Sequence, residues 1–229
     1  MKTLDTVNRK IFDARVDWSA IDITLARKDT QVLDLVREAC LVESYLPIFT
    51  SRMNELFWDD VAATSVFTIE GFEAYGHYFI LRKYLDVVGY QPVTDEDVVA
   101  LRRRDRQRRY TDKVRELVNF MGTEHFAAEF FSDLVSLTEE PVLKKTLPRF
   151  AAEEVNHSRF AFDLLAAMVK NDPQVKSRIH QAAAEFKHVG AYVLPKVSPA
   201  KEDNLEIIQG FNQLIEDLTG QPLSESLNK

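Results

Sequence analysis

Apolar residues recur at the spacing of an α-helix along most of the chain. The first apolar stripe follows a candidate N-cap at Thr30 and predicts a helix over residues 31–57. Its members are Leu33, Val36, Cys40, Leu46, Met53 and Phe57. A second helix is predicted to end just before Gly89, because glycine is the residue that most often follows the last turn of a helix. Residues 58–60 are interpreted as a break between the first two helices. In all, four long helices are predicted: the first over residues 31–57, the second from this break to residue 88, the third over 111–137 and the fourth over 141–171.

Shorter elements join and follow these four helices. Thr94 and Asp97 have the spacing of a capping box, which predicts the start of an arginine-rich connecting helix. Two amphipathic segments, 173–187 and 203–218, predict helices after the bundle. Pro148 falls inside the fourth long helix, where it should produce a kink or mark a later start.

The composition supports long helices in a single domain. Only 7 Gly and 8 Pro occur in 229 residues, which argues against an all-β fold with many turns. No change of composition marks a linker, so residues 1–229 are interpreted as one all-α domain with a bundle core over about 31–171. No apolar run is long enough for a membrane span, and the N-terminus has no signal-peptide pattern, so a cytoplasmic protein is expected. Cys40, the only cysteine, excludes an internal disulfide, a cysteine-based zinc site and an iron–sulfur cluster.

Each long helix carries carboxylate on its apolar stripe. An unpaired buried carboxylate costs several kcal/mol, so carboxylates that converge need a shared cation or shared protons. On the second and fourth helices, histidines accompany the carboxylates. The candidate residues, in helix order, are Glu43; Glu70, Glu73 and His77; Glu124; and Glu154 and His157.

The spacing of these residues suggests an internal repeat. Thirty residues separate Glu43 from Glu73, and thirty separate Glu124 from Glu154. Two antiparallel helix pairs would therefore bring the ligands to a similar depth, which is the layout of di-metal carboxylate sites in helical bundles. Hard carboxylates with one imidazole per metal favour two iron ions, or manganese, over zinc, and open coordination positions on such ions bind O₂.

Several motifs resemble the soluble acyl-carrier-protein desaturases, a branch of the ferritin-like non-haem di-iron oxidases. The segments that carry the resemblance, together with Glu124, are Glu43–Pro47 (ESYLP), His77–Leu85 (HYFILRKYL) and Phe150–His157 (FAAEEVNH). It spans roughly residues 30–170. It implies a ferritin-like four-helix bundle with additional N-terminal, connecting and C-terminal helices. The ligands that it implies are Glu43, His77, Glu124, Glu154 and His157.

The chain departs from the family pattern at two positions. The family has its second-helix carboxylate three residues before the histidine, where this chain has Ala74. A π-bulge would let Glu73 reach the site, and otherwise Glu70 or a water molecule completes it. Many relatives also have Thr one turn after the third-helix Glu, where this chain has Ala127.

The resemblance implies an O₂-dependent di-iron oxidoreductase, a desaturase or hydroxylase that acts on an unactivated C–H bond. Its substrate would be fatty-acyl-like, possibly bound to a carrier protein, in an apolar channel beside Glu43 and Glu124. An external donor such as ferredoxin would supply electrons, and a homodimer is possible. One alternative is a di-iron N-oxygenase or other tailoring monooxygenase of a small molecule. Another is a non-catalytic ferritin-like iron-binding protein.

The charged and polar residues outside the stripes add two expectations. The net charge of −7 argues against nucleic acid as a partner. Six arginines in eight positions form either the solvated face of a connecting helix or a docking patch for an acidic carrier protein or ferredoxin. They are Arg102, Arg103, Arg104, Arg106, Arg108 and Arg109. His180 and His188 lie outside the four-helix pattern and are predicted to be solvated, and His125 is expected beside the ligands or at the surface.

Overall fold

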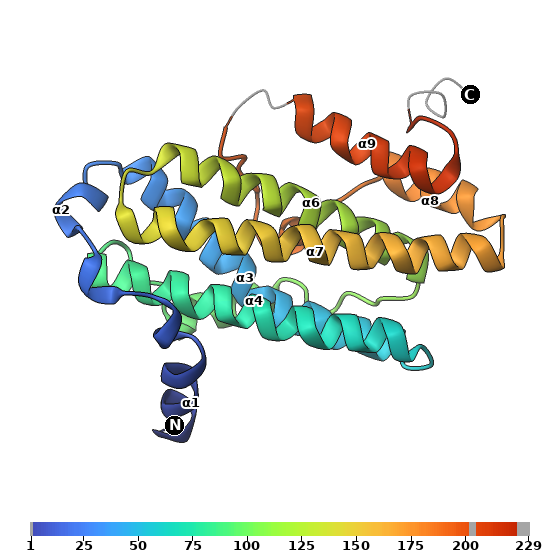
Figure 1. Ribbon diagram of the computed structural model, residues 1–229. Helices are drawn as coiled ribbons and strands as arrows, with labels where there is room; N and C mark the ends of the chain where they lie inside the picture. Colours follow the sequence, from blue (N-terminus) through green and yellow to red (C-terminus); the bar gives the residue numbers. More distant parts are fainter. Residues whose placement is uncertain (1, 202–204, 224–229) are drawn as a thin grey trace.

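Four long helices lie side by side in the computed structural model, which describes residues 2–201 and 205–223 (Figure 1). Within these ranges every regular element is helical and there is no strand, so the all-α prediction is confirmed. The long helices are α3 (Thr30–Leu56), α4 (Val61–Val88), α6 (Lys113–Leu137) and α7 (Pro141–Asn171). Their bounds agree with the apolar periodicity to within two residues.

The long helices form two hairpins, α3–α4 and α6–α7, each joined by a connection of three or four residues. Connections this short make the two helices of a pair antiparallel neighbours. The hairpins meet through contacts of α4 with α7 and of α3 with α6. The two carboxylate–histidine helices, α4 and α7, are therefore neighbours in space.

A carboxylate starts each long helix. Asp29 accepts a hydrogen bond from the Val32 amide at 3.1 Å, Asp60 from the Ala63 amide at 3.0 Å, and Glu140 from the Leu143 amide at 2.8 Å. Asp112 caps α6 in the same way. The prediction that Thr30 is the first cap is wrong by one residue, because Asp29 offers the acceptor and Thr30 is already helical. Gly89 ends α4 with φ 69°, as predicted.

Pro148 does not mark a later start of α7. The helix begins at Pro141, whose missing amide hydrogen costs nothing at a first-turn position, and continues past Pro148 to Asn171. Pro148 and Lys144, the residue whose carbonyl loses its helical partner, are both exposed. Water therefore reaches that carbonyl, which makes an internal proline tolerable at this position.

Shorter helices surround the bundle. They are α1 (Lys2–Ile11), α2 (Ile23–Ala26), α5 (Asp95–Arg103), α8 (Val175–Ala184) and α9 (Leu205–Thr219), with 3₁₀ turns η1 (Asp13–Arg15), η2 (Trp18–Ala20) and η3 (Val189–Tyr192). The predicted capping box opens α5. The predicted segments 173–187 and 203–218 correspond to α8 and α9, although 203 and 204 lie outside the described residues. None of the described helices combines the length and the apolar character that a membrane span requires.

Helices α8 and α9 pack against α6 and form a second layer on the bundle (Figure 1). The contact is close at Gly122, where a Cβ atom would lie 2.5 Å from the Phe186 ring and 2.9 Å from the Phe211 ring. A glycine at this position therefore lets the segment after α8 and the middle of α9 approach the α6 backbone.

Candidate metal centre

Six of the predicted ligands meet in the interior of the bundle. Each of the four long helices contributes, and every one of these residues is at most 3 % exposed. They are Glu43 from α3, Glu70 and His77 from α4, Glu124 from α6, and Glu154 and His157 from α7.

Two overlapping groups make up this cluster. The first group contains Glu70, Glu124, Glu154 and His157, and the second contains Glu43, His77 and Glu154. Within each group, one potential ligand atom per residue lies within 4.8 Å of all the others. Two cation positions that share one carboxylate are the arrangement that this geometry would accommodate.

Glu154 lies between the two histidines. Its Oε1 is 2.9 Å from His77 Nδ1, and its Oε2 is 2.7 Å from His157 Nδ1. The two oxygens of one carboxylate therefore serve different groups, as they do when a carboxylate bridges two metal ions.

A second carboxylate fixes the outer nitrogen of each histidine ring. His77 Nε2 lies 2.7 Å from Glu153 Oε2, and His157 Nε2 lies 2.7 Å from Glu73 Oε2. A carboxylate only accepts hydrogen bonds, so these contacts place a hydrogen on Nε2 and direct Nδ1 at the cluster, where a bound cation would take the place of the Nδ1 proton that faces Glu154. This orientation by an outer carboxylate is typical of metal-ligating histidines.

Carboxylate oxygens outnumber the hydrogen-bond donors in the centre of the cluster. Among the described residues, seven buried side-chain atoms here make no hydrogen bond, although four of them face an oppositely charged atom of a Glu–His ion pair. They are Glu43 Oε2, both carboxylate oxygens of Glu70, both of Glu124, Glu154 Oε1, and His77 Nδ1. Buried oxygens without a partner are costly, and this donor set fits divalent cations that take carboxylate and imidazole.

The acid–base behaviour of the cluster shows the same need for positive charge. Burial raises the pKa of Glu43 to about 7. Burial likewise raises the pKa of Glu70, and burial together with neighbouring carboxylates raises the pKa of Glu124 well above its usual range. Burial opposes ionisation of Glu154, but His77 and His157 lower its pKa below the usual range. Protons therefore occupy the site where no cation does, and loading a cation must release them.

Glu70, and not Glu73, belongs to the cluster. Helix α4 is an uninterrupted α-helix, so the π-bulge that would turn Glu73 inward is absent from it. Glu70 precedes His77 by seven residues, almost two full turns, and the two side chains share one face. Glu73 is rotated away from that face, is 30 % exposed, and contacts the outer nitrogen of His157. The structure therefore favours the alternative second-helix ligand.

An apolar cavity of about 260 Å³ adjoins the cluster at Glu43. Phe126, Ala127 and Phe130 of α6 line one wall, and the segment over residues 186–200 lines another. Glu124, which we expected beside the channel, does not line this cavity. His188 does, and it is half-buried, so the prediction that it is solvated is wrong. The segment that contains His188 lacks helical periodicity, so no sequence signal assigned it to a wall.

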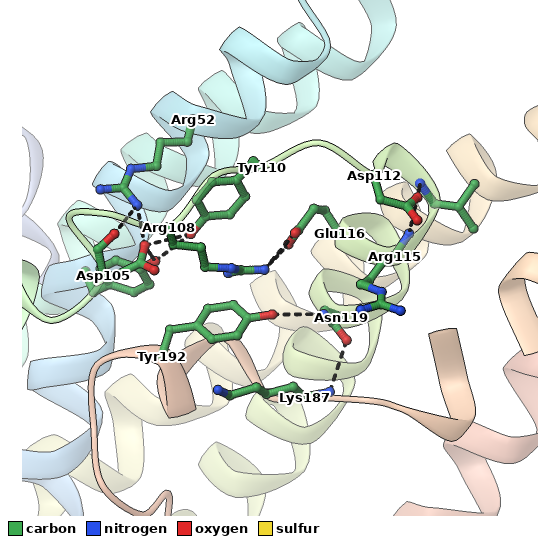
Figure 2. A network of polar contacts seen from close by, with 12 residues as sticks. Arg52, Asp105, Arg108, Tyr110, Asp112, Arg115, Glu116, Asn119, Lys187 and Tyr192 are labelled. Carbon is green, nitrogen blue, oxygen red and sulfur yellow. Dashed lines mark hydrogen bonds and ion pairs between the residues drawn. The ribbon is translucent and has the colours of Figure 1, made fainter. Parts of the chain in front are cut away.

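Three arginines of the run bond to other parts of the chain, and four of the six are exposed. Arg102 donates to the Ser44 carbonyl, and Arg104 donates to the Val193 carbonyl. Figure 2 shows Arg108 directed at Glu116, with an N–O distance of 2.6 Å. The Arg108 guanidinium also lies 3.4 Å from the centre of the Tyr192 ring. Helix α5 ends at Arg103, so the run is not one helical face.

Three arginines of the run therefore hold parts of the chain together. Arg103, Arg104, Arg106 and Arg109 are exposed and Arg102 and Arg108 are half-buried, and the hypothesis that the run is a docking patch stays a prediction.

Comparison with protein families, with curated proteins and with solved structures finds no match for this chain. The resemblance to the desaturases therefore stays a prediction that rests on the motifs quoted above. The interpretation of the cluster rests on its own geometry and chemistry.

Proposed function

We propose that the chain is an O₂-dependent oxidoreductase with two metal ions, preferably iron, at the Glu/His cluster. The observation that supports this proposal most directly is the pair of overlapping ligand groups that share Glu154 inside a buried cluster. A ferritin-like arrangement of the four long helices belongs to the same proposal. The observed pairing, in which α4 adjoins α7 and α3 adjoins α6, supports it.

The donor set favours iron over zinc. Four carboxylates and two imidazoles offer more ligands than one tetrahedral ion takes, and hard oxygen ligands suit iron or manganese. The four carboxylates balance the charge of two divalent ions, which leaves the two histidines neutral. Bound iron would supply the capacity to bind and reduce O₂.

The residues around the metal positions would perform three tasks. Glu153 and Glu73 would hold the histidine rings with Nδ1 inward. Glu154 would keep the two ions at a fixed separation. The apolar wall beside Glu43 would exclude water and hold an apolar substrate next to the reacting centre.

The reaction that this arrangement would support is oxidation of an unactivated C–H bond, by desaturation or hydroxylation. Electrons would come from an external donor protein. The cavity favours an enzyme over an iron store, because storage does not require an apolar space beside the metal ligands.

Counting metal ions tests this proposal. We expect the wild-type chain, incubated anaerobically with excess Fe(II) and desalted, to retain about two irons and to consume O₂ on exposure to air. Glu154→Gln should retain at most about one iron per chain, because it leaves only two ligands in the smaller group and three in the larger group. Glu55→Gln, which changes an exposed carboxylate of α3, should behave like the wild type. A wild-type chain that retains no iron or manganese would refute the proposal, and iron bound without any O₂ consumption would refute the oxidase.

A further inference from the structure

We propose that the cavity beside Glu43 binds a neutral, apolar carbonyl compound whose oxygen accepts a hydrogen bond from His188. This inference concerns the substrate of the proposed oxidoreductase, and in that respect it rests on the proposed function. The binding site itself is defined by the cavity wall alone.

The size and lining of the cavity set the first requirement. Its volume is about 260 Å³, whereas an apolar cavity of about 150 Å³ holds one benzene molecule. Phenylalanine, valine and alanine side chains make most of the wall. The cavity therefore suits a hydrocarbon body about the size of two fused six-membered rings.

His188 is held firmly in this wall by the backbone on either side of it. The Lys187 amide donates to Asn119 Oδ1 at 3.0 Å, and the Val189 amide donates to Thr123 Oγ1 at 2.8 Å. Figure 2 shows Asn119 bonded both to Lys187 and to the Tyr192 hydroxyl. Two side chains of α6 thus fix the segment on both sides of His188, which is the support that a positioning residue needs.

Among the residues that the structure describes, the Nε2 atom of His188 has no hydrogen-bond partner and is available to a ligand. Its Nδ1 accepts a hydrogen bond from the Gly190 amide at 3.0 Å. Burial lowers the pKa of this histidine to about 4, so the ring is neutral at pH 7. A neutral ring that accepts at Nδ1 carries its hydrogen on Nε2, which makes Nε2 a donor.

The acidic residues in the wall already have partners in the chain. Glu38 accepts a hydrogen bond from the Ser198 amide at 2.5 Å, and Asp133 forms an ion pair with Lys201 at 2.9 Å. Glu43 belongs to the candidate metal centre. These carboxylates disfavour an anionic ligand such as a free carboxylic acid, and the donor at His188 favours a neutral acceptor.

A matched pair of probes tests the inference. 2-Acetylnaphthalene and 2-ethylnaphthalene have nearly the same shape and differ by one carbonyl oxygen. Calorimetric titration of the iron-loaded wild type should show the acetyl compound binding about tenfold more tightly, which is the upper range for one buried neutral hydrogen bond. In His188→Phe this preference should disappear, and the acetyl compound should bind no more tightly than the ethyl compound, because its carbonyl then lacks a donor.

Three further variants keep the test decisive. His188→Asn retains an acceptor for the Gly190 amide on a shorter side chain, so it should also lose the preference, even if His188→Phe fails to fold. His180→Phe changes a histidine outside the cavity wall and should keep the preference for the acetyl compound. Ser198→Ala removes another neutral donor of the wall and should keep it as well.

Several outcomes would overturn the inference. They are failure of the wild type to bind either probe, an unchanged preference in His188→Asn, and loss of the preference in Ser198→Ala. The same titrations on chelator-treated protein separate this inference from the proposed function. A preference that persists in a chain unable to retain iron would support the site and refute the oxidase, whereas a chain with two irons and no preference would do the reverse.

Discussion

The two ligand groups of the candidate centre differ in number of residues and in surroundings. The group at His157 has four members, all at most 1 % exposed. The group at His77 has three, and one of them, Glu43, also lines the apolar cavity. Sites with a full ligand set are typically structural, whereas sites with an open position bind substrate. The comparison therefore indicates that the His77 group adjoins the cavity, so in the proposed oxidoreductase it is the position that would face a substrate.

Removing one carboxylate from each group should give unequal losses of metal. Glu43→Gln leaves only His77 and Glu154 in the smaller group, so we expect it to retain one iron per chain. Glu70→Gln leaves three ligands in the larger group, so two irons should remain at saturating Fe(II), with weaker binding. Elemental analysis after Fe(II) titration measures both. If Glu70→Gln retained one iron and Glu43→Gln retained two, the conclusion that the His77 group is the one with the smaller ligand set would be wrong.

The outer carboxylates offer a finer test of the same difference. Glu153→Gln and Glu73→Gln should each weaken one iron position by about 10- to 100-fold, because each removes the group that orients one histidine. Glu153 also pairs with Arg149 at 3.1 Å, and it is 19 % exposed against 30 % for Glu73. The effect of Glu153→Gln should therefore be the larger one. Competition with a calibrated chelator measures the affinities, and equal wild-type affinity in both variants would contradict the assigned roles.

The smallest expected effect concerns the cavity wall. The unfolded chain protonates His188 near its ordinary pKa of 6.5, but the folded chain does so only near pH 4. Acidification from pH 7 to 5 therefore favours the unfolded state, and this residue should cost about 1 to 2 kcal/mol. His188→Asn should lose less of its free energy of unfolding between pH 7 and pH 5 than the wild type does, by about this amount. The other titrating groups contribute the same loss in both proteins. Urea unfolding at both pH values measures it, and identical losses in wild type and variant would contradict it.

The pattern of apolar and polar residues is sufficient to predict the long helices and the acidic residues that face the interior of the bundle. Apolar periodicity predicts long helices well, and a Glu within such a stripe stands out because it is costly to bury. The same pattern cannot decide between Glu70 and Glu73. The two residues lie about 60° apart on α4, and only the rotation of the packed helix determines which one faces the interior.

The position of His188 in the cavity wall also cannot be predicted from the sequence, because it depends on how a segment without helical periodicity folds back onto α6. The division of the arginine run has a similar cause. The chain leaves the helix at Arg103, so helical spacing no longer tells which later side chains face inward.

Three consecutive residues of α6 serve three different parts of the molecule. Gly122 gives Phe186 and Phe211 their close approach, Thr123 anchors the Val189 amide, and Glu124 enters the metal cluster. Successive residues of an α-helix point about 100° apart, which is why one turn reaches all three. A single inserted or deleted residue just before Gly122 would rotate the whole turn and misdirect all three at once. A substitution in this turn would therefore disturb one of the three contacts, whereas a change in chain length would disturb all of them.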